Sequence, residues 1–273
     1  MKFSMYQVDA FADKLFTGNP AAVIPLKKWI DDGLMQKIAM ENNLAETVFF
    51  VQRKDKDYDI RWFTPAAEIN LCGHATLASA YVLFQELKVK QNKIVFHSKS
   101  GPLTVTKNKK EQGEGFSARL DFPSWKPERI SDYPAGLEQA LGVKEIIGVY
   151  KNRDLLIELN SEEDVLNANP DLTTLKKMNE KFIITAPGNE VDFVSRFFAP
   201  SIGVDEDPVT GSAHAQLIPF WSEKLAKVKM TARQLSSRGG RLDCEQHGKR
   251  VFIGGGCVFF FKTEFVIRKK DWV

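Results

Sequence analysis

Two stretches of the sequence share one pattern and decide the fold: Phe63-Thr64-Pro65 before Cys72-Gly73-His74-Ala75, and Phe198-Ala199-Pro200 before Thr210-Gly211-Ser212-Ala213. Each is typical of a strand end, a loop, and a glycine with small residues that opens an apolar helix. The copies are offset by 135 residues at the phenylalanines and 138 at the glycines, in a chain of 273 residues. The repeat indicates a duplicated domain, in which two helix N-termini could face a single cleft.

The stretch after the first glycine predicts a buried helix. Residues 74–87 are apolar or small nearly all the way round until Gln85 and Glu86. A helix without a polar face belongs inside a domain. Strand-like runs at 93–97, 103–107 and 116–122 follow it. An α+β fold, with a curved sheet around one buried helix, is the simplest arrangement.

The second half repeats this organisation. Residues 211–225 form the second candidate central helix, which we expect Pro219 to kink or shorten. Two prolines in residues 123–127 indicate a linker, and the glycines at 254–256 indicate a turn between two late strands. We therefore expect domains at 1–122 and 128–262, with the last strand, about 263–273, able to return to the first.

Composition excludes several classes of protein. Hydrophobic residues make up 43% of the chain and charged residues 27%, as in an ordinary globular protein. The net charge of +3 is too small to imply a nucleic-acid partner. No stretch approaches the ~18 consecutive apolar residues of a membrane span. Three cysteines and an opening without a secretory leader pattern favour a cytoplasmic protein.

The two helix starts are candidate anion sites. A helix N-terminus carries unpaired amides and partial positive charge, which suit a carboxylate or phosphate. Gly73 and Gly211 allow close approach to those amides, and His74 and Ser212 add side-chain donors. The alternative is that both are merely tightly packed helix starts. The shared design favours a ligand site.

Glu46 is the candidate proton carrier. It lies where a loop enters the apolar strand at 47–51. A carboxylate among such neighbours loses hydration, which suits a group that must gain and lose a proton. The alternative is an exposed glutamate at a strand end.

Two further residues border the helix starts. Asp207 precedes a proline, which biases it to an extended conformation that could aim its side chain into a cleft or simply shape a turn. Cys72 directly precedes a helix start, where a thiol could become a thiolate, although it could also be only a small buried residue. Thr210 holds the equivalent position in the repeat, and its hydroxyl is too weakly acidic for that role. A symmetric two-thiol mechanism is therefore not available.

Other chemistries have little support in the sequence. Neither Cys72-Gly73-His74 nor Cys244-Glu245-Gln246-His247 has the paired spacing of a zinc module, so we expect no metal. The glycines at 254–256 precede an apolar strand and not a helix, so they are no nucleotide fingerprint. Ser212 lacks the Gly-x-Ser-x-Gly context of a hydrolase nucleophile.

Several motifs together resemble the PhzF-like phenazine-biosynthesis proteins. The matches occur in order along the chain: Val8-Asp9-Ala10-Phe11, Phe16-Thr17-Gly18-Asn19-Pro20, Asn43-Leu44-Ala45-Glu46-Thr47, Arg61-Trp62-Phe63-Thr64-Pro65, Cys72-Gly73-His74-Ala75-Thr76 and Gly203-Val204-Asp205-Glu206-Asp207-Pro208-Val209-Thr210-Gly211-Ser212-Ala213. The resemblance implies two pseudo-symmetric domains of the diaminopimelate-epimerase type, each a barrel-like, mostly antiparallel sheet around a central helix, with the active site between them. It also implies a homodimer and isomerisation without a cofactor.

The resemblance also assigns roles. A glutamate at the position of Glu46 relays a proton within a cyclic, conjugated carboxylic acid in a family member. His74, Asp207 and Ser212 match residues that flank that substrate, and Asn19 matches a loop at the edge of the site. The related epimerases and racemases use two cysteines, of which only Cys72 is present.

Three hypotheses follow. The first is an isomerase or tautomerase that acts on a small conjugated carboxylic acid, with catalytic Glu46, His74 and Asp207. Its substrate would be bound by Asn19, Cys72, Gly73, Thr210, Gly211 and Ser212. The second is an amino-acid racemase or epimerase, and the third is a protein that keeps the scaffold only to bind a ligand or another protein.

Overall fold

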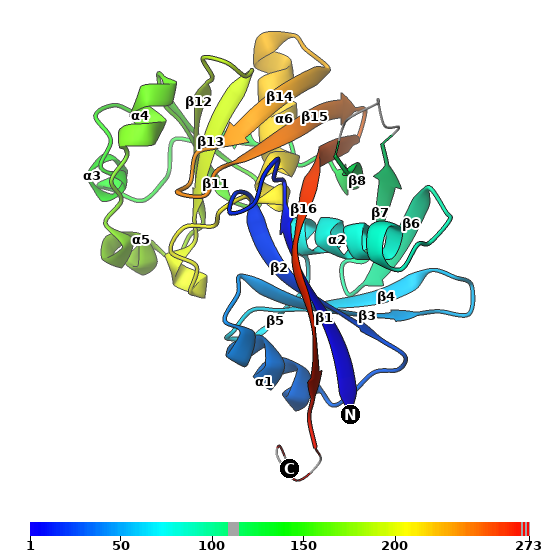
Figure 1. Ribbon diagram of the computed structural model, residues 1–273. Coiled ribbons are helices and arrows are strands. Elements are labelled where there is room, and N and C mark those ends of the chain that lie inside the picture. Colours follow the sequence, from blue (N-terminus) through cyan, green and yellow to red (C-terminus); the bar gives the residue numbers. More distant parts are fainter. Residues whose placement is uncertain (109–114, 269, 271, 273) are drawn as a thin grey trace. The chain divides into compact units, whose positions relative to one another are not determined.

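The chain folds into two compact units in a computed structural model that describes residues 1–108, 115–268, 270 and 272 (Figure 1). The first unit contains Met1–Asp121 and Gly254–Val273, and the second contains Phe122–Ile253. Both mix α-helices with mostly antiparallel strands, as the α+β prediction requires. No helix within the described ranges is long and apolar enough to cross a membrane.

The first unit is built on one strongly curved sheet. Its strands are β1 (Lys2–Ala10), β2 (Asn19–Leu26), β3 (Glu46–Gln52), β4 (Tyr58–Phe63), β5 (Glu68–Ile69), β6 (Lys93–Ser98), β7 (Gly101–Lys107), β8 (Ser117–Pro123) and β16 (Arg250–Val266). The β2–β3 and β4–β6 pairs are parallel. β16 pairs with β1, and the Cys257 amide donates to the carbonyl of Phe116 just before β8 at 3.3 Å. These bonds close the sheet as a barrel.

Helix α2 (Gly73–Tyr81) is the buried centre of this unit (Figure 1). Every residue from Gly73 to Ala80 is buried, and the helix packs against β1, β2 and β3. The hydroxyls of Thr76 and Ser79 donate to carbonyls four residues earlier, so neither is left unpaired in the core. The predicted helix over 74–87 is thus confirmed to Tyr81, and a π-helical turn (Val82–Glu86) continues it. Helix α1 (Asp32–Asn42), capped by Asp31, packs against β3 and β4.

The second unit repeats the same strand order. Its strands are β9 (Glu128–Arg129), β10 (Gly148–Lys151), β11 (Leu155–Glu158), β12 (Phe182–Pro187), β13 (Phe193–Phe198), β14 (Lys229–Gln234) and β15 (Gly240–His247). The parallel pairs are β11–β12 and β13–β14, at the same steps as β2–β3 and β4–β6. Its helices are α3 (Leu137–Leu141), α4 (Glu162–Asn167), α5 (Leu172–Met178), a short 3-10 turn (Pro200–Ile202) and α6 (Gly211–Leu225).

Helix α6 contains Pro219 and still runs unbroken to Leu225. The expectation that Pro219 shortens this helix is wrong. A proline cannot donate to the carbonyl four residues earlier, which here belongs to Ala215. The amide of Trp125 donates to that carbonyl at 2.9 Å, so the group that proline leaves unpaired has a partner. A rule that considers only neighbouring residues cannot predict this long-range bond.

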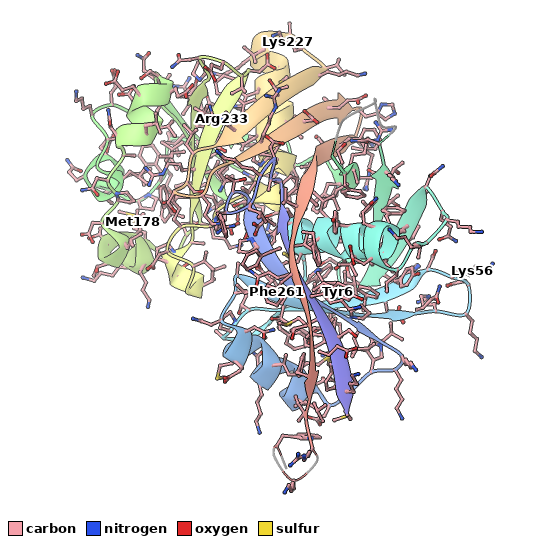
Figure 2. The ribbon with its side chains drawn as sticks, viewed as in Figure 1. Tyr6, Lys56, Met178, Lys227, Arg233 and Phe261 are labelled. Atoms are coloured by element: carbon pink, nitrogen blue, oxygen red, sulfur yellow. The ribbon has the colours of Figure 1, made fainter. Side chains whose placement is uncertain are left out.

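The end of the chain corrects two sequence predictions. The prediction that residues 254–262 belong to the second domain is wrong, because they lie in the first unit, where Cys257 pairs with Ala10 and Lys262 with Tyr6. Tyr6 and Phe261 mark this strand pair in Figure 2.

The glycines at 254–256 form no turn and lie within β16. A Cβ on Gly256 would meet the carbonyl oxygen of Ala12 at 2.6 Å, so the glycine permits a close backbone approach. Positions 269, 271 and 273 of the predicted last strand lie outside the described residues.

Candidate functional site

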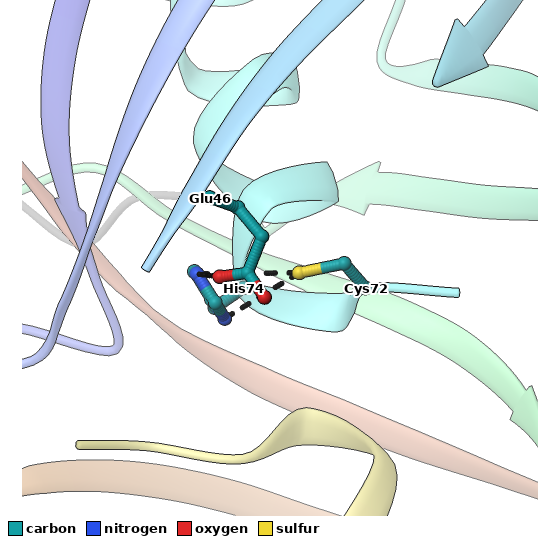
Figure 3. Close-up of side chains that lie close together, drawn as sticks. All are labelled: Glu46, Cys72 and His74. Atoms are coloured by element: carbon teal, nitrogen blue, oxygen red, sulfur yellow. Dashed lines mark hydrogen bonds and ion pairs between the residues drawn. The ribbon is translucent and has the colours of Figure 1, made fainter. Parts of the chain in front are cut away.

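Glu46, Cys72 and His74 come together in the first unit (Figure 3). Nε2 of His74 lies 2.8 Å from Oε2 of Glu46, and Nδ1 of His74 lies 3.5 Å from Sγ of Cys72. Glu46 opens β3, Cys72 immediately precedes α2, and His74 is the second residue of that helix. The three residues are 9%, 5% and 3% exposed. Burial of the Glu46 carboxylate contradicts the alternative of an exposed strand-end glutamate.

The contact between Glu46 and His74 has the distance of an ion pair. Oε2 of Glu46 is nevertheless without an aligned hydrogen-bond donor among the described residues. The two observations agree if the atoms are close but poorly oriented for a hydrogen bond. A buried carboxylate oxygen that is attracted by a cation and not saturated by donors remains available to a proton.

The cluster fixes the charge of His74. Burial opposes the imidazolium, but interactions with the neighbouring Cys72 and then Glu46 outweigh burial and raise the pKa of His74 well above its ordinary value. Burial raises the pKa of the Cys72 thiol to about 11, with the nearby Glu46 carboxylate acting in the same direction. At neutral pH the cluster therefore contains an imidazolium and a neutral thiol, so Cys72 is a poor base.

Asn19 joins this cluster from the start of β2. Its Nδ2 lies 3.1 Å from Nδ1 of His74, and Asn19 is fully buried. Gly18, with φ of +70°, makes the preceding turn possible, because a Cβ there would lie 2.3 Å from the Ala10 carbonyl oxygen. The amide of Phe16 donates to Oδ2 of Asp9 and ties the loop down. Asn19 thus contacts His74 of the candidate catalytic pair.

The backbone amides at the N-terminus of α2 have no side-chain cap. Cys72 makes no side-chain capping hydrogen bond, and no acidic residue occupies the first turn. Gly73 is buried at the first helical position. Backbone amides with partial positive charge therefore lie beside His74, which suits an anion site.

Asp207 and Thr210 form a second group, in the other unit. Oγ1 of Thr210 donates to Oδ2 of Asp207 at 2.5 Å, and the Asp207 amide donates to the Phe197 carbonyl. Gln234 is 1% exposed and holds both residues: it accepts from the Thr210 amide at 2.8 Å and donates to the Asp207 carbonyl at 2.6 Å. The position of Asp207 is therefore determined by a buried network.

Helix α6 begins beside this group with the same features as α2. Thr210 makes no capping hydrogen bond, no acidic residue lies in the first turn, and Gly211 is buried while Ser212 is partly exposed. Nδ1 of His214 donates to the Thr210 carbonyl at 2.9 Å, the bond that Thr76 makes to Cys72 in α2. Burial lowers the pKa of His214 to about 4, so this imidazole is neutral.

Sequence reasoning missed Gln234, which holds Asp207, and Arg196, which holds the neighbouring Glu206. Arg196 makes a two-point ion pair with Glu206, with Nε to Oε1 at 2.7 Å, and donates to the carbonyls of Val165 and Ala168. Gln234 ends β14, far from the motif in sequence. The polar Gln234 in a strand with buried Met230 and Ala232 was the available signal, since buried amides need partners.

The donor atoms of Glu46, Cys72 and His74 all lie within 4.8 Å of one another. Within the part of the chain that the structure describes, no other group of three or more such residues is as close. The spacing rule used on the sequence did not reveal this set, because its third donor comes from a different strand.

The chain resembles known proteins along nearly its whole length. A family model described as phenazine biosynthesis-like protein (PhzC-PhzF) matches residues 8–263. An uncharacterized isomerase of Pseudomonas aeruginosa is 46% identical over 261 residues, covering 95% of this chain and 97% of that protein. A crystal structure of a PhzF-family phenazine biosynthesis protein from Enterococcus faecalis has a TM-score of 0.91 at 49% identity, covering 98% of this chain and all of the other. A hydroxyproline epimerase from Agrobacterium vitis, 8% identical with a TM-score of 0.64, covers 96% of this chain and 92% of its own and shares the fold alone.

Proposed function

The chain belongs to the phenazine biosynthesis-like PhzF family and is an isomerase of that family, and from this premise we propose that it moves a proton within a small conjugated carboxylic acid without a cofactor. Glu46 is the single acid and base of the reaction. The observation that carries the proposal is the buried Glu46 carboxylate, 2.8 Å from His74, with one oxygen lacking an aligned donor. The substrate class rests on the resemblance.

The roles of Glu46 and His74 follow from their charges. Glu46 removes a proton from a carbon that conjugation has made acidic, and returns it to a second carbon on the same face of the substrate. The imidazolium of His74 stays protonated through this cycle and stabilises the negative charge that develops on the substrate. Positioning both carbons against one base supplies much of the rate.

The uncapped start of α2 supports a carboxylate as the substrate's anionic group. Its amides and Gly73 offer donors, and the absence of an acidic residue in the first turn leaves the helix dipole uncompensated there. Asn19 keeps the ring of His74 in place. Cys72 lines the same position as a neutral thiol.

The second unit would contribute through Asp207, Thr210, Gly211 and Ser212. The two units share one strand order, and each central helix begins with an uncapped glycine start, which supports a pair of pseudo-symmetric domains. That Asp207 and Ser212 contact the same substrate as Glu46 is our proposal from the resemblance. A homodimer is proposed on the same ground, and a cytoplasmic location is proposed from the three sparse, free cysteines.

One observation bears on the racemase alternative. Cys72 lies in the cluster, but its raised pKa keeps it a thiol, and Thr210 holds the equivalent place in α6. Amino acids incubated in deuterated water would show label at the α-carbon and loss of optical purity if this alternative held. Such exchange, abolished by Cys72→Ser, would replace the proposal above.

A deuterium-exchange screen tests the proposed function. Small conjugated carboxylic acids are incubated with the protein in deuterated water and followed by proton NMR for shifted double bonds and carbon-bound deuterium. The wild type should isomerise members of this class, and Glu46→Gln should not. Glu41→Gln, at an exposed glutamate of α1, is the matched control and should behave as the wild type. Turnover that survives Glu46→Gln would remove the assignment of the base.

A further inference from the structure

We propose that Asn19 is a positioning residue that keeps the ring of His74 doubly protonated, by accepting the Nδ1–H bond with its amide oxygen. Asn19 contacts the side of the imidazole that faces away from Glu46. The consequence for catalysis rests on the proposed function, whereas the protonation of the ring does not. The two claims can therefore fail separately.

The two ring nitrogens of His74 face different groups (Figure 3). Nε2 lies 2.8 Å from Oε2 of Glu46, whereas Nδ1 lies 3.1 Å from the Asn19 amide and 3.5 Å from Sγ of Cys72. A carboxylate only accepts hydrogen bonds, so Nε2 carries a hydrogen in either charge state of the ring. The charge of His74 therefore depends on whether Nδ1 also carries one.

The Asn19 amide can serve either state of Nδ1. Half a turn about its last side-chain bond exchanges the NH2 group and the oxygen within the same shape. With Nδ2 at 3.1 Å, the contact suits a neutral ring whose Nδ1 accepts. With Nδ1 protonated, the NH2 group would place one donor against another, so the oxygen must face the ring. Cys72 is the weaker partner, because a thiol sulfur is a weak acceptor and lies farther away.

Two considerations favour the protonated ring. The titratable groups that act on His74, Cys72 and then Glu46, raise its pKa well above the ordinary value in spite of burial. A hydrogen bond from a cationic donor is also roughly twice as strong as one between neutral groups. The amide therefore stabilises the imidazolium more than the neutral imidazole, and Asn19 adds to the bias that the neighbouring groups create.

The backbone determines where the Asn19 amide lies. Asn19 is fully buried and opens β2 opposite Ala10. The preceding Gly18 has a φ of +70°, and a Cβ there would lie 2.3 Å from the Ala10 carbonyl oxygen. The amide of Phe16 donates to Oδ2 of Asp9 at 3.2 Å and holds the loop that leads into β2. An apolar side chain at position 19 would thus take the amide's place and leave Nδ1–H without its acceptor.

The proposed isomerisation needs the second proton of His74, because an imidazolium stabilises the negative charge that develops on the substrate. Loss of the Asn19 acceptor should therefore lower kcat most at the higher pH values, where the ring becomes neutral. A loss of packing alone would lower kcat by a similar factor at every pH. The pH profile of kcat distinguishes the two effects.

NMR of the protein with ¹⁵N-labelled histidine tests the state of the ring without a substrate. The chain has four histidines, and the His74→Gln variant identifies the signals of His74. In the wild type both ring nitrogens of His74 should carry a hydrogen at neutral pH. Asn19→Leu removes the acceptor and should lower the pH at which the ring loses its second proton by about one pH unit. Asn19→Asp keeps an acceptor and should not lower it.

Asn108→Leu is the matched control. The Asn108 amide donates to Oγ of Ser117 at 2.7 Å in the same unit, so the titration of His74 in this variant should match that of the wild type. Thermal unfolding shows whether each variant is folded. A titration of folded Asn19→Leu that coincides with the wild type's, or a fall in Asn19→Asp as large as in Asn19→Leu, would overturn the proposal. An unprotonated Nδ1 in the wild type at neutral pH would also overturn it, and this result needs no variant.

The outcomes for Asn19 and for the proposed function are distinct. A second ring proton that depends on Asn19, in a protein whose turnover survives Glu46→Gln, would keep the role of Asn19 and remove the proposed base. Turnover that is lost in Glu46→Gln, with a His74 titration unaffected by Asn19→Leu, would keep the proposed function and remove the role of Asn19.

Discussion

The imidazole of His74 lies 2.8 Å from the carboxylate of Glu46 in the first unit, although the rest of β3 and the whole of β4 and β5 separate the two residues in sequence. His74 is held by the start of α2, and Glu46 by the start of β3. A cationic imidazole and a carboxylate are thus fixed on neighbouring elements before any ligand arrives. This preorganised pair makes the stability and activity of the protein depend on pH.

The pair predicts that His74 stabilises the fold less as pH rises. Its pKa is raised in the folded state, so the native protein binds more protons than the unfolded chain above the ordinary pKa of about 6.5. The contribution is complete below that pH and is lost as pH rises through the folded pKa. Denaturant unfolding should show that the free energy of unfolding of the wild type exceeds that of His74→Gln by an amount that falls as pH rises above about 6.5. A difference that grows with pH would contradict the raised pKa.

His214 predicts the opposite dependence. Burial lowers its pKa to about 4, so the unfolded chain takes up a proton that the native protein refuses as pH falls from about 6.5 to 4. His214 should therefore destabilise the fold by roughly 3 kcal/mol at pH 4 relative to pH 7. In His214→Gln the loss of stability over this window should be smaller than in the wild type. Equal acid sensitivity of the two proteins would show that His214 protonates without unfolding.

Gln234 should prove essential to the position of Asp207. In Gln234→Leu the Thr210 amide and the Asp207 carbonyl lose their partner, and two buried groups without partners cost about 2–6 kcal/mol together. We expect a lower midpoint of urea unfolding, and a loss of kcat larger than any change in substrate affinity. Gln246→Leu, at a less buried glutamine of β15, is the control and should cost under about 1 kcal/mol. Equal effects of the two variants would show that Gln234 has no special role.

Local patterns in the sequence were sufficient for the elements that carry the site. The glycine starts at Gly73 and Gly211 are confirmed as the first residues of α2 and α6, and Glu46 opens the predicted strand. These features depend on neighbouring residues alone, because helix starts and strand starts have local signatures.

The remaining features depend on contacts between distant parts of the chain. Trp125 satisfies the carbonyl that Pro219 leaves unpaired, and Ala12 explains why glycine occupies position 256 within a strand. The meeting of Glu46 with Cys72 likewise requires β3 and the start of α2 to be neighbours. No rule based on spacing could reveal that set.

The kinetics and binding of Glu46→Gln test the central claim most directly. With an acid that the wild type isomerises, a general base contributes about 10²- to 10⁴-fold, so kcat should fall by at least ~100-fold. The dissociation constant, measured by calorimetry, should change little, because the amide keeps the size of the side chain. A kcat within about threefold of the wild type, too small a loss for a general base, would contradict the account.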